Sequence, residues 1–202
     1  MAKKILNEVK QPRIVNIIGT APSLGAYKPI YGENWVINHA WKYGTRVDVW
    51  FAIEGWKEMV QASRSLLVGE AEFLKFCRNY KGKIYGFRGE KMFDEKNNET
   101  IAESEGLPIQ ELRCLAGTYF TSSIAWCFAM VALQEKLGNK KVDIVNLYGI
   151  ELWISHDLSE YSEQTECVNY WIAYLNGLGI QVNIPAYLLM AVQSKNSNIY
   201  GF

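Results

Sequence analysis

The chain has 202 residues, of which 49% are hydrophobic, and its 21 Lys and Arg balance its 21 Asp and Glu to a formal net charge of zero. This apolar content is enough for a buried core, which argues against a disordered protein. The zero charge, with Lys and Arg scattered along the sequence, argues against a nucleic-acid partner, which would need a basic cluster. We expect one α/β domain over residues 1–202, with an N-terminal extension over 1–12 and a polar tail over 193–202.

Metal-binding and membrane proteins are also disfavoured. There are two histidines and four cysteines, without a C-x-x-C pair, so we expect reduced thiols and no metal site. Residues 1–10 lack the apolar stretch of a signal peptide, and the most apolar run, residues 122–133, is too short to cross a bilayer. We therefore expect a cytoplasmic protein without a membrane span.

Short apolar runs that stop at Gly, Asn or Glu predict buried strands, and these alternate with helical segments. In chain order, the predicted elements are strands over 13–18, 35–38 and 47–53, a helix over 56–80 that Gly69 divides, a strand over 83–87, a helix with an irregular loop over 88–107, an edge strand over 109–112, a helix over 117–137, a strand over 142–148, a polar loop over 151–160, a helix over 162–178 and a strand over 180–184. Strands that alternate with helices pair in parallel through right-handed crossovers, so we expect an α/β fold around a mainly parallel sheet.

The segment 117–137 is the clearest helix in the sequence, because it is long, apolar and bounded by glycines. Trp126 and Met130 are four residues apart and therefore on one face, so we expect both in the core. On the following helix, Tyr170 and Trp171 are predicted to be core residues as well.

Ligands of open parallel sheets bind beyond the carboxyl ends of the strands. Applied to the predicted strands, this rule selects Thr20, Ser23, Asn38, His39, Glu54, Thr121, Ser122 and residues 149–164. We expect the side chains of Thr20, Asn38, Ser122 and Glu151 to converge on one cleft.

The first loop, G-T-A-P-S over residues 19–23, lacks the Lys of a Walker A loop and the glycine spacing of a dinucleotide-binding loop. Thr20 and Ser23 offer hydroxyls, and nearby backbone N–H groups can receive an anion; a plain turn capped by Ser23 is the alternative. Thr121 and Ser122 stand at a helix start, where hydroxyls and unpaired N–H groups suit a phosphate, and ordinary capping is again the alternative.

Polar residues also follow the second and third predicted strands. The amide of Asn38 can bind a phosphate or a base edge, or it can hold a loop. His39 can act as an acid or base, or it can pack beside the neighbouring tryptophans. Glu54 follows the third strand and is a candidate ligand-binding residue.

The stretch 149–164 holds the most reactive residue types. Glu151 follows a strand and a glycine, so we expect it to face the site as a general base or as the partner of a sugar hydroxyl. We take Glu151, His156 and Tyr161 as candidate catalytic residues and Gln164 as a candidate ligand-binding residue. The alternative interpretation is a solvated loop.

The motifs occur in a characteristic order: a strand, G-x-x-P-S-L, a strand ending in Asn, T-S at a helix start, a strand ending in Y-G-I-E, then Tyr, Gln and a helix before G-I-x-V-x-I-P. Over residues 13–185 this order resembles the bacterial sialyltransferases and the related motility-accessory and pterin diphosphokinase-like proteins, with small phage and prophage proteins of that superfamily as the nearest look-alikes. The resemblance implies a single Rossmann-like domain with helices on both faces of its sheet.

The resemblance also implies roles for individual residues. In the sialyltransferases, the residues that match Thr20, Asn38 and Ser122 hold the nucleotide phosphate, and a tyrosine that matches Tyr161 assists the leaving phosphate. The family usually has Asn in place of Thr20. Its base is a histidine after the late loop, whereas His156 lies earlier in this chain. The resemblance therefore implies nucleotide binding more firmly than sialyl transfer.

From these observations we expect a nucleotide-binding, transferase-like protein, specifically a glycosyltransferase that uses a nucleotide sugar, in the host cytoplasm if a phage encodes it. One alternative is a non-catalytic nucleotide binder that sequesters or senses its ligand. Another is a Mg²⁺-dependent, diphosphokinase-like phosphoryl transferase with Glu54 and Glu151 as metal ligands. The expected partner is a small-molecule nucleotide, and the sequence leaves a homo-oligomer open.

Overall fold

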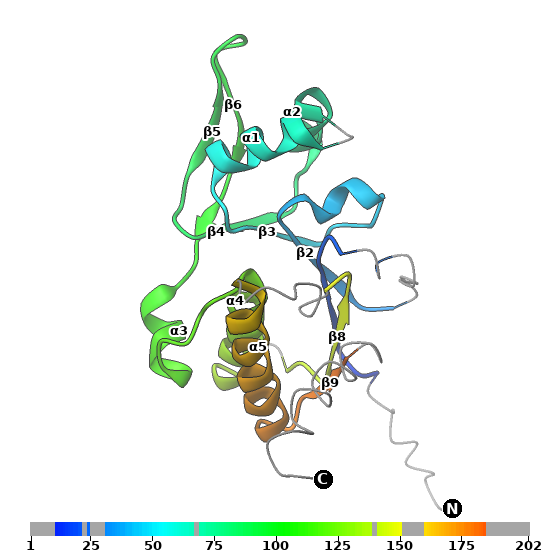
Figure 1. Ribbon diagram of the computed structural model, residues 1–202, viewed down its shortest axis with the longest axis vertical. Coiled ribbons are helices and arrows are strands. Elements are labelled where there is room, and N and C mark those ends of the chain that lie inside the picture. The colour runs from blue at the N-terminus through cyan, green and yellow to red at the C-terminus, as the bar shows by residue number, and fades with distance from the viewer. Residues whose placement is uncertain are drawn as a thin grey trace, which may run out of the picture.

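The computed structural model describes residues 11–21, 24, 31–66, 69–138, 141–150 and 160–184, with the side chains of the last range from Gln164 onward. Figure 1 shows one sheet running through the molecule, helices on both sides of it, and a hairpin of residues 91–103 at one end. This arrangement is that of a layered α/β protein.

A seven-stranded sheet forms the centre of the fold. In chain order its strands are β1 (Ile14–Ile18), β2 (Glu33–Ile37), β3 (Val49–Ala52), β4 (Lys83–Gly86), β7 (Glu105–Gly106), β8 (Ile144–Tyr148) and β9 (Gln181–Asn183). They lie in the order β7-β4-β3-β2-β1-β8-β9, and every pairing among them is parallel. The predicted parallel α/β sheet is confirmed.

Helices cover both faces of this sheet (Figure 1). They are the 3-10 helix η2 (Asn38–Tyr43) and the α-helices α1 (Trp56–Ser65), α2 (Gly69–Asn79), α3 (Ile109–Ala116), α4 (Ser123–Lys136) and α5 (Glu160–Gly177). Successive residues of a strand point to opposite faces. Ile17 and Trp35 therefore join the core formed with α3, α4 and α5, whereas Ile18 and Val36 join the core formed with η2, α1 and α2.

The strand order changes direction at β1. The chain passes from β1 through β2 and β3 to β4 on one side, and later returns to β8 on the other side of β1. This reversal is the feature of Rossmann-like folds that opens a crevice at the carboxyl ends of the two central strands. At that point a Cβ on Gly19 would lie 2.5 Å from the Gly149 carbonyl oxygen, and Gly149 has a φ of +62°. Two backbones therefore approach here more closely than any side chain would permit.

A row of asparagines crosses four strands at one level. Asn183, Asn146, Asn16 and Asn34 are register neighbours in β9, β8, β1 and β2. Each Nδ2 donates to the side-chain oxygen of the next asparagine at 2.8–2.9 Å, and Asn34 Nδ2 ends the row by donating to the Arg46 carbonyl at 2.9 Å. The row supplies buried Asn16 and Asn34 with hydrogen-bond partners and fixes the register of the strands that carry it.

The helix predicted within 88–107 is wrong. This segment forms the antiparallel strands β5 (Lys91–Asp94) and β6 (Glu99–Glu103), followed by the short β7. Buried Met92 lies between exposed Lys91 and Phe93, which is the alternation of a strand, and the turn contains Asn98 in a left-handed conformation at φ 53°. The charged residues that resembled a helical surface instead cover a hairpin that packs through Met92, Ile101 and Ala102.

The edge strand predicted over 109–112 is also wrong, because these residues begin α3. Leu112 is buried, with Ile109 and Leu115 packed beside it at a three-residue spacing, which is a helical period that a four-residue window does not reveal. The helix predicted over 117–137 exists but begins at Ser123. The break predicted at Gly69 is confirmed, since α1 ends at Ser65 and α2 begins at Gly69.

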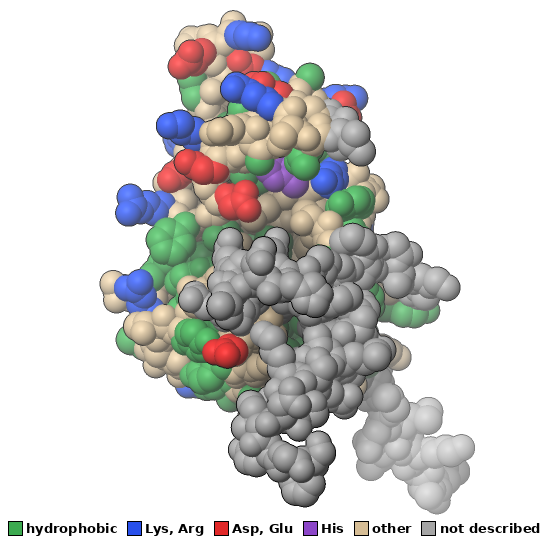
Figure 2. Space-filling view, viewed as in Figure 1, with side chains coloured by type: hydrophobic (Ala, Val, Ile, Leu, Met, Phe, Trp, Pro, Cys, Tyr) green, Lys and Arg blue, Asp and Glu red, His purple; other side chains and the backbone are tan. Residues whose placement is uncertain are grey.

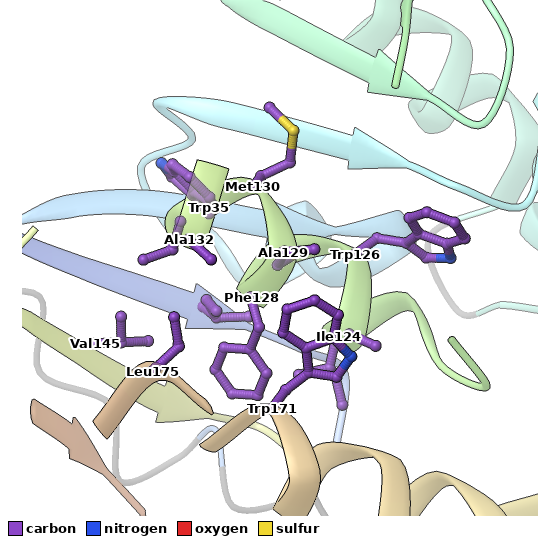
Figure 3. Close-up of a cluster of buried hydrophobic side chains, with 14 of the residues drawn as sticks. Trp35, Ile124, Trp126, Phe128, Ala129, Met130, Ala132, Val145, Trp171 and Leu175 are labelled. Carbon is purple, nitrogen blue, oxygen red and sulfur yellow. The ribbon is translucent and has the colours of Figure 1, made fainter. Parts of the chain in front are cut away.

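Helix α4 is buried over nine consecutive residues, 124–132. Trp126 and Met130 are 7% and 4% exposed, which confirms their predicted place in the core. Figure 3 shows the ring of Phe128 beside Trp171, while Trp126 leaves the helix on another side. Trp171 is buried as predicted, but Tyr170 is 39% exposed, so its predicted core position is wrong.

Candidate functional site

A cavity of about 870 Å³ lies along the carboxyl edge of the sheet. Its wall includes residues that follow β4, β3, β2, β1 and β8, which are five neighbouring strands. Four strand spacings of about 4.8 Å make this edge roughly 19 Å long. The cavity therefore suits an elongated small molecule.

The first loop is held in place by its backbone. Ala21 N donates to the Gly149 carbonyl at 2.8 Å, and Tyr43 Oη donates to the Thr20 carbonyl at 3.0 Å. Thr20 is exposed and lies on the cavity wall. The loop is thus anchored to β8 on one side and to the end of η2 on the other, with the Thr20 side chain accessible.

Asn38 joins the ends of β2 and β3. Its Oδ1 accepts from Ile53 N at 3.0 Å and its Nδ2 donates to Glu54 Oε1 at 2.8 Å. Its carbonyl accepts from Trp50 Nε1 at 2.8 Å, and its backbone has a left-handed φ of 45°. These contacts are those of a residue that holds a loop, although Asn38 also lines the cavity.

His39 is buried beside the same cavity. Its Nε2 lies 3.0 Å from the Met59 carbonyl, and its ring packs 5.3 Å from that of Phe73. Burial lowers the pKa of His39; the Met59 carbonyl opposes this shift, and Lys42 adds to it. A carbonyl only accepts hydrogen bonds, so Nε2 carries the proton and Nδ1 keeps its lone pair in the neutral ring.

The start of α4 borders the cavity with three hydroxyl residues, Thr121, Ser122 and Ser123. Ser122 is the N-cap, and its Oγ accepts from Ala125 N at 3.3 Å. The first turn of α4 contains no acidic residue that would neutralise the positive end of the helix dipole. Ser122 therefore has the capping role that was one of its two interpretations from the sequence. The helix end that it caps favours an anion.

One face of α5 holds the segment that leads into α4. Tyr174 Oη donates to the Leu115 carbonyl, and Tyr170 Oη donates to the Ala116 carbonyl. The Tyr119 carbonyl accepts from both Trp171 Nε1 and Cys167 Sγ. These four bonds are 2.6–3.3 Å long. Cys167 Sγ also accepts from Thr121 N at 3.4 Å. Tyr170 is exposed because its ring lies at the surface while its hydroxyl reaches the Ala116 carbonyl. Through these bonds α5 fixes the loop before Ser122.

An aromatic wall closes part of the cavity. The ring of Phe120 stacks on Trp126 with 3.9 Å between centroids and 9° between planes, and Phe87 meets Trp126 edge-on at 5.5 Å. All three residues line the cavity, and Phe87 is 41% exposed. Such a wall suits a planar ring in the ligand.

Every candidate ligand-binding residue that the structure describes lies on the wall of this one cavity. Those on its wall are Thr20, Asn38, His39, Glu54, Thr121, Ser122 and Gln164. Ser23, Glu151 and His156 lie outside the described residues, and for Tyr161 only the helical backbone is described.

Several wall residues were not selected from the sequence, and Phe87 and Lys42 are two of them. Phe87 directly follows β4, so the strand-end rule that selected Asn38 and Glu54 would have found it. Lys42 reaches the wall from η2, four residues after Asn38, and no sequence signal marked that short helix.

Within the described part of the chain, no group of three His, Cys, Asp or Glu side chains could hold a metal ion. No helix there is both long and apolar enough to cross a bilayer. The four cysteines are free thiols. On the face shown in Figure 2, basic and acidic side chains are interspersed.

Comparison of the chain with family models, with curated proteins and with solved structures finds no match. Functional inference therefore depends on the geometry of the cavity and on the chemistry of its wall.

Proposed function

We propose that the chain binds a nucleotide in the cavity at the carboxyl edge of the sheet, and that it is a glycosyltransferase-type transferase that uses a nucleotide sugar. The observation that supports this most is that Thr20, Asn38 and Ser122, from three separate elements, share one cavity at the point where the strand order reverses. Open α/β sheets bind their ligands at this point.

The start of α4 is the proposed phosphate site. It offers backbone N–H groups and the positive end of a helix dipole, and Lys42 adds a cation to the same wall. Gly19 and Gly149 let the first loop and the end of β8 pack backbone against backbone at the reversal point, which holds Thr20 on the cavity wall. During transfer, these groups would stabilise the charge that develops on the departing nucleotide phosphate.

Transfer also requires a base that deprotonates the acceptor. Glu151, His156 and Tyr161 remain the proposed catalytic residues on the sequence argument. One observation favours the alternative of a non-catalytic nucleotide binder. Asn38 and Ser122 already use side-chain hydrogen bonds to hold their own loops, which suits a rigid binding site.

Thermal unfolding and calorimetric titration with nucleoside diphosphates and nucleotide sugars, with and without Mg²⁺, test the proposal. A ligand present at about 100 times its Kd should stabilise the protein by about 2.7 kcal/mol. Ser122→Ala should weaken binding by about 1.5–3 kcal/mol, while Thr100→Ala, on the exposed hairpin, should leave it unchanged.

Failure of every nucleotide to bind the wild type would refute the proposed function. Slow release of free nucleotide from a nucleotide sugar would separate a transferase from a binder. A strict Mg²⁺ requirement for phosphoryl transfer would instead support the diphosphokinase alternative.

A further inference from the structure

A second cavity, of about 310 Å³, adjoins the first at the ends of β3 and β4. Ile53, Glu54 and Phe87 line both cavities. Phe87 therefore stands between two spaces, and its ring is 41% exposed. A ligand that passes this ring can enter the second cavity.

The second cavity is acidic. Glu54, Glu58 and Glu90 line it, together with Arg88. The carboxylates of Glu58 and Glu90 both lie beside Gly55, since a Cβ there would lie 3.1 Å from Glu58 Oε2 and 3.9 Å from Glu90 Oε2. No group among the described residues has the make-up of a metal site. A ligand edge that carries N–H donors therefore fits these oxygens better than a cation does.

The two ends of the combined space have opposite preferences. A phosphate is repelled by the carboxylates and favoured by the start of α4 and by Lys42. From β1 to β4 there are three strand spacings, roughly 14 Å, which is the length scale of a nucleotide rather than of an inorganic anion. A nucleotide would thus lie with its phosphate at α4 and its base at Phe87.

The base at that end would meet a ring and carboxylates. Aromatic side chains stack on every nucleobase, so Phe87 alone selects none. A carboxylate only accepts hydrogen bonds. Guanine presents N1–H and N2–H side by side and can make two parallel bonds to one carboxylate. Adenine, cytosine and uracil each carry an acceptor atom next to their N–H donor. A carboxylate that accepts from this donor would repel the neighbouring acceptor.

We propose that the nucleotide of the proposed function is a guanine nucleotide, with its base stacked on Phe87 and its N–H edge on the carboxylates of Glu58 and Glu90. This inference rests on nucleotide binding at the cavity. It assigns the second cavity as the base subsite and makes Phe87 and these glutamates the residues that determine specificity.

Calorimetry with GDP, IDP, ADP, CDP, UDP and pyrophosphate on the full chain tests the subsite. GDP should bind most tightly. IDP, which lacks the N2 amino group, should bind about tenfold more weakly or worse, because one hydrogen bond to a charged group is lost. Pyrophosphate should bind more weakly than GDP, without contacting the subsite.

Two variants with matched controls locate the base. Phe87→Ala should weaken GDP binding about five- to 150-fold and leave pyrophosphate binding unchanged. Phe93→Ala, an exposed phenylalanine on the hairpin and outside both cavities, should change neither. Glu90→Gln should weaken GDP more than IDP, whereas Glu103→Gln, on β6, should have no effect.

Tighter binding of another nucleoside diphosphate, or equal effects of Phe87→Ala and Phe93→Ala, would overturn the guanine subsite and leave the proposed function standing. Loss of pyrophosphate binding in Phe87→Ala would also overturn it, because the change would then act on the whole cavity. Absence of binding by any nucleotide would overturn both proposals.

Discussion

The two faces of the sheet are built from alternating residues of the same strands, yet they pack in different ways. On one face, α4 is buried over the whole of residues 124–132. On the other, α1 and α2 each bury only a narrow stripe, such as Met59 or Phe73 with Cys77. Trp50 lies at the centre of that second face. Its ring is in contact with those of Trp56, Phe73, Phe76 and Tyr80.

The polar groups of the two faces differ as well. The α1 and α2 face contains the asparagine row and the bond from Trp50 Nε1 to the Asn38 carbonyl. Among the described residues, the buried Nε1 of Trp35 on the α4 face has no hydrogen-bond partner, and the same is true of Trp41 Nε1 on the other face. Both faces contain hydrogen bonds from buried side chains, such as that from Trp171 Nε1 to the Tyr119 carbonyl on the α4 face. The clearest contrast is therefore between Trp50, whose indole has a partner, and Trp35, whose indole has none among the described residues. Substitutions that remove volume or bonds separately can test this difference.

The largest expected effect is the loss of volume on the α4 face. Trp126→Ala should lower the free energy of unfolding by about 3–5 kcal/mol, because a buried ring stacked on Phe120 leaves a cavity. Urea unfolding measures this change, with the exposed Phe93→Ala as the control. A wild-type midpoint for Trp126→Ala would contradict the burial of this ring.

The contribution of the hydrogen bond from Trp50 Nε1 can be separated from that of packing by replacing two buried tryptophans, Trp50 and Trp35, with phenylalanine. Trp50→Phe and Trp35→Phe remove the same volume from residues that are 0% and 1% exposed. Only Trp50→Phe leaves a buried acceptor, the Asn38 carbonyl, without its donor. We expect Trp50→Phe to cost about 1–3 kcal/mol more than Trp35→Phe in urea unfolding. Equal losses would show that the hydrogen bond from Trp50 Nε1 adds no stability.

The asparagine row should be sensitive at its centre and tolerant at its end. Asn16→Ala leaves the amides of buried Asn34 and half-buried Asn146 partly unpaired and should cost about 1–3 kcal/mol. Asn183→Ala removes an exposed end and should cost less than about 0.5 kcal/mol. Chemical unfolding of both variants decides this, and similar losses at the two positions would show that the row adds no stability of its own.

The smallest expected effect concerns pH. Burial lowers the pKa of His39 in the folded state, whereas the unfolded chain takes up a proton near the ordinary value of 6.5. The contribution of neutral His39 is therefore complete above about pH 6.5 and is lost as the pH falls from there to the folded-state pKa. The stability of His39→Gln should fall less than that of the wild type between about pH 8 and about pH 5.5 in thermal unfolding. Parallel losses would show that His39 does not titrate with folding.

Asn38 has a structural role in addition to its place on the cavity wall. Asn38 lies at a strand end and could be taken as dispensable for folding. Its bonds to Ile53 N and Glu54 show that it holds β2 and β3 together. Asn38→Ala therefore disturbs the fold as well as the cavity, and Ser122→Ala is the cleaner variant for ligand binding, at a cost to the helix cap of about 0.5–2 kcal/mol.

The sequence by itself determined the parallel α/β architecture, the buried helix α4 and the candidate residues at the strand ends. These features follow from local periodicity and from short apolar runs that stop at polar residues. Both signals can be recognised within one continuous segment of the sequence. Thr20 and Asn38 could be selected because every parallel strand delivers its last residue to the same edge, and Ser122 could be selected because it stands at a predicted helix start. The hairpin of β5 and β6 and the start of α3 were missed because their short windows fit more than one period.

Only the tertiary structure decided how these residues meet. The order β7-β4-β3-β2-β1-β8-β9 brings residues more than 100 positions apart, such as Gly19 and Gly149, into contact. It also aligns Asn16 with Asn146, and it sets Phe87 beside Trp126. Strand order, register and ring contacts depend on which partners a strand finds, and no single segment contains that information.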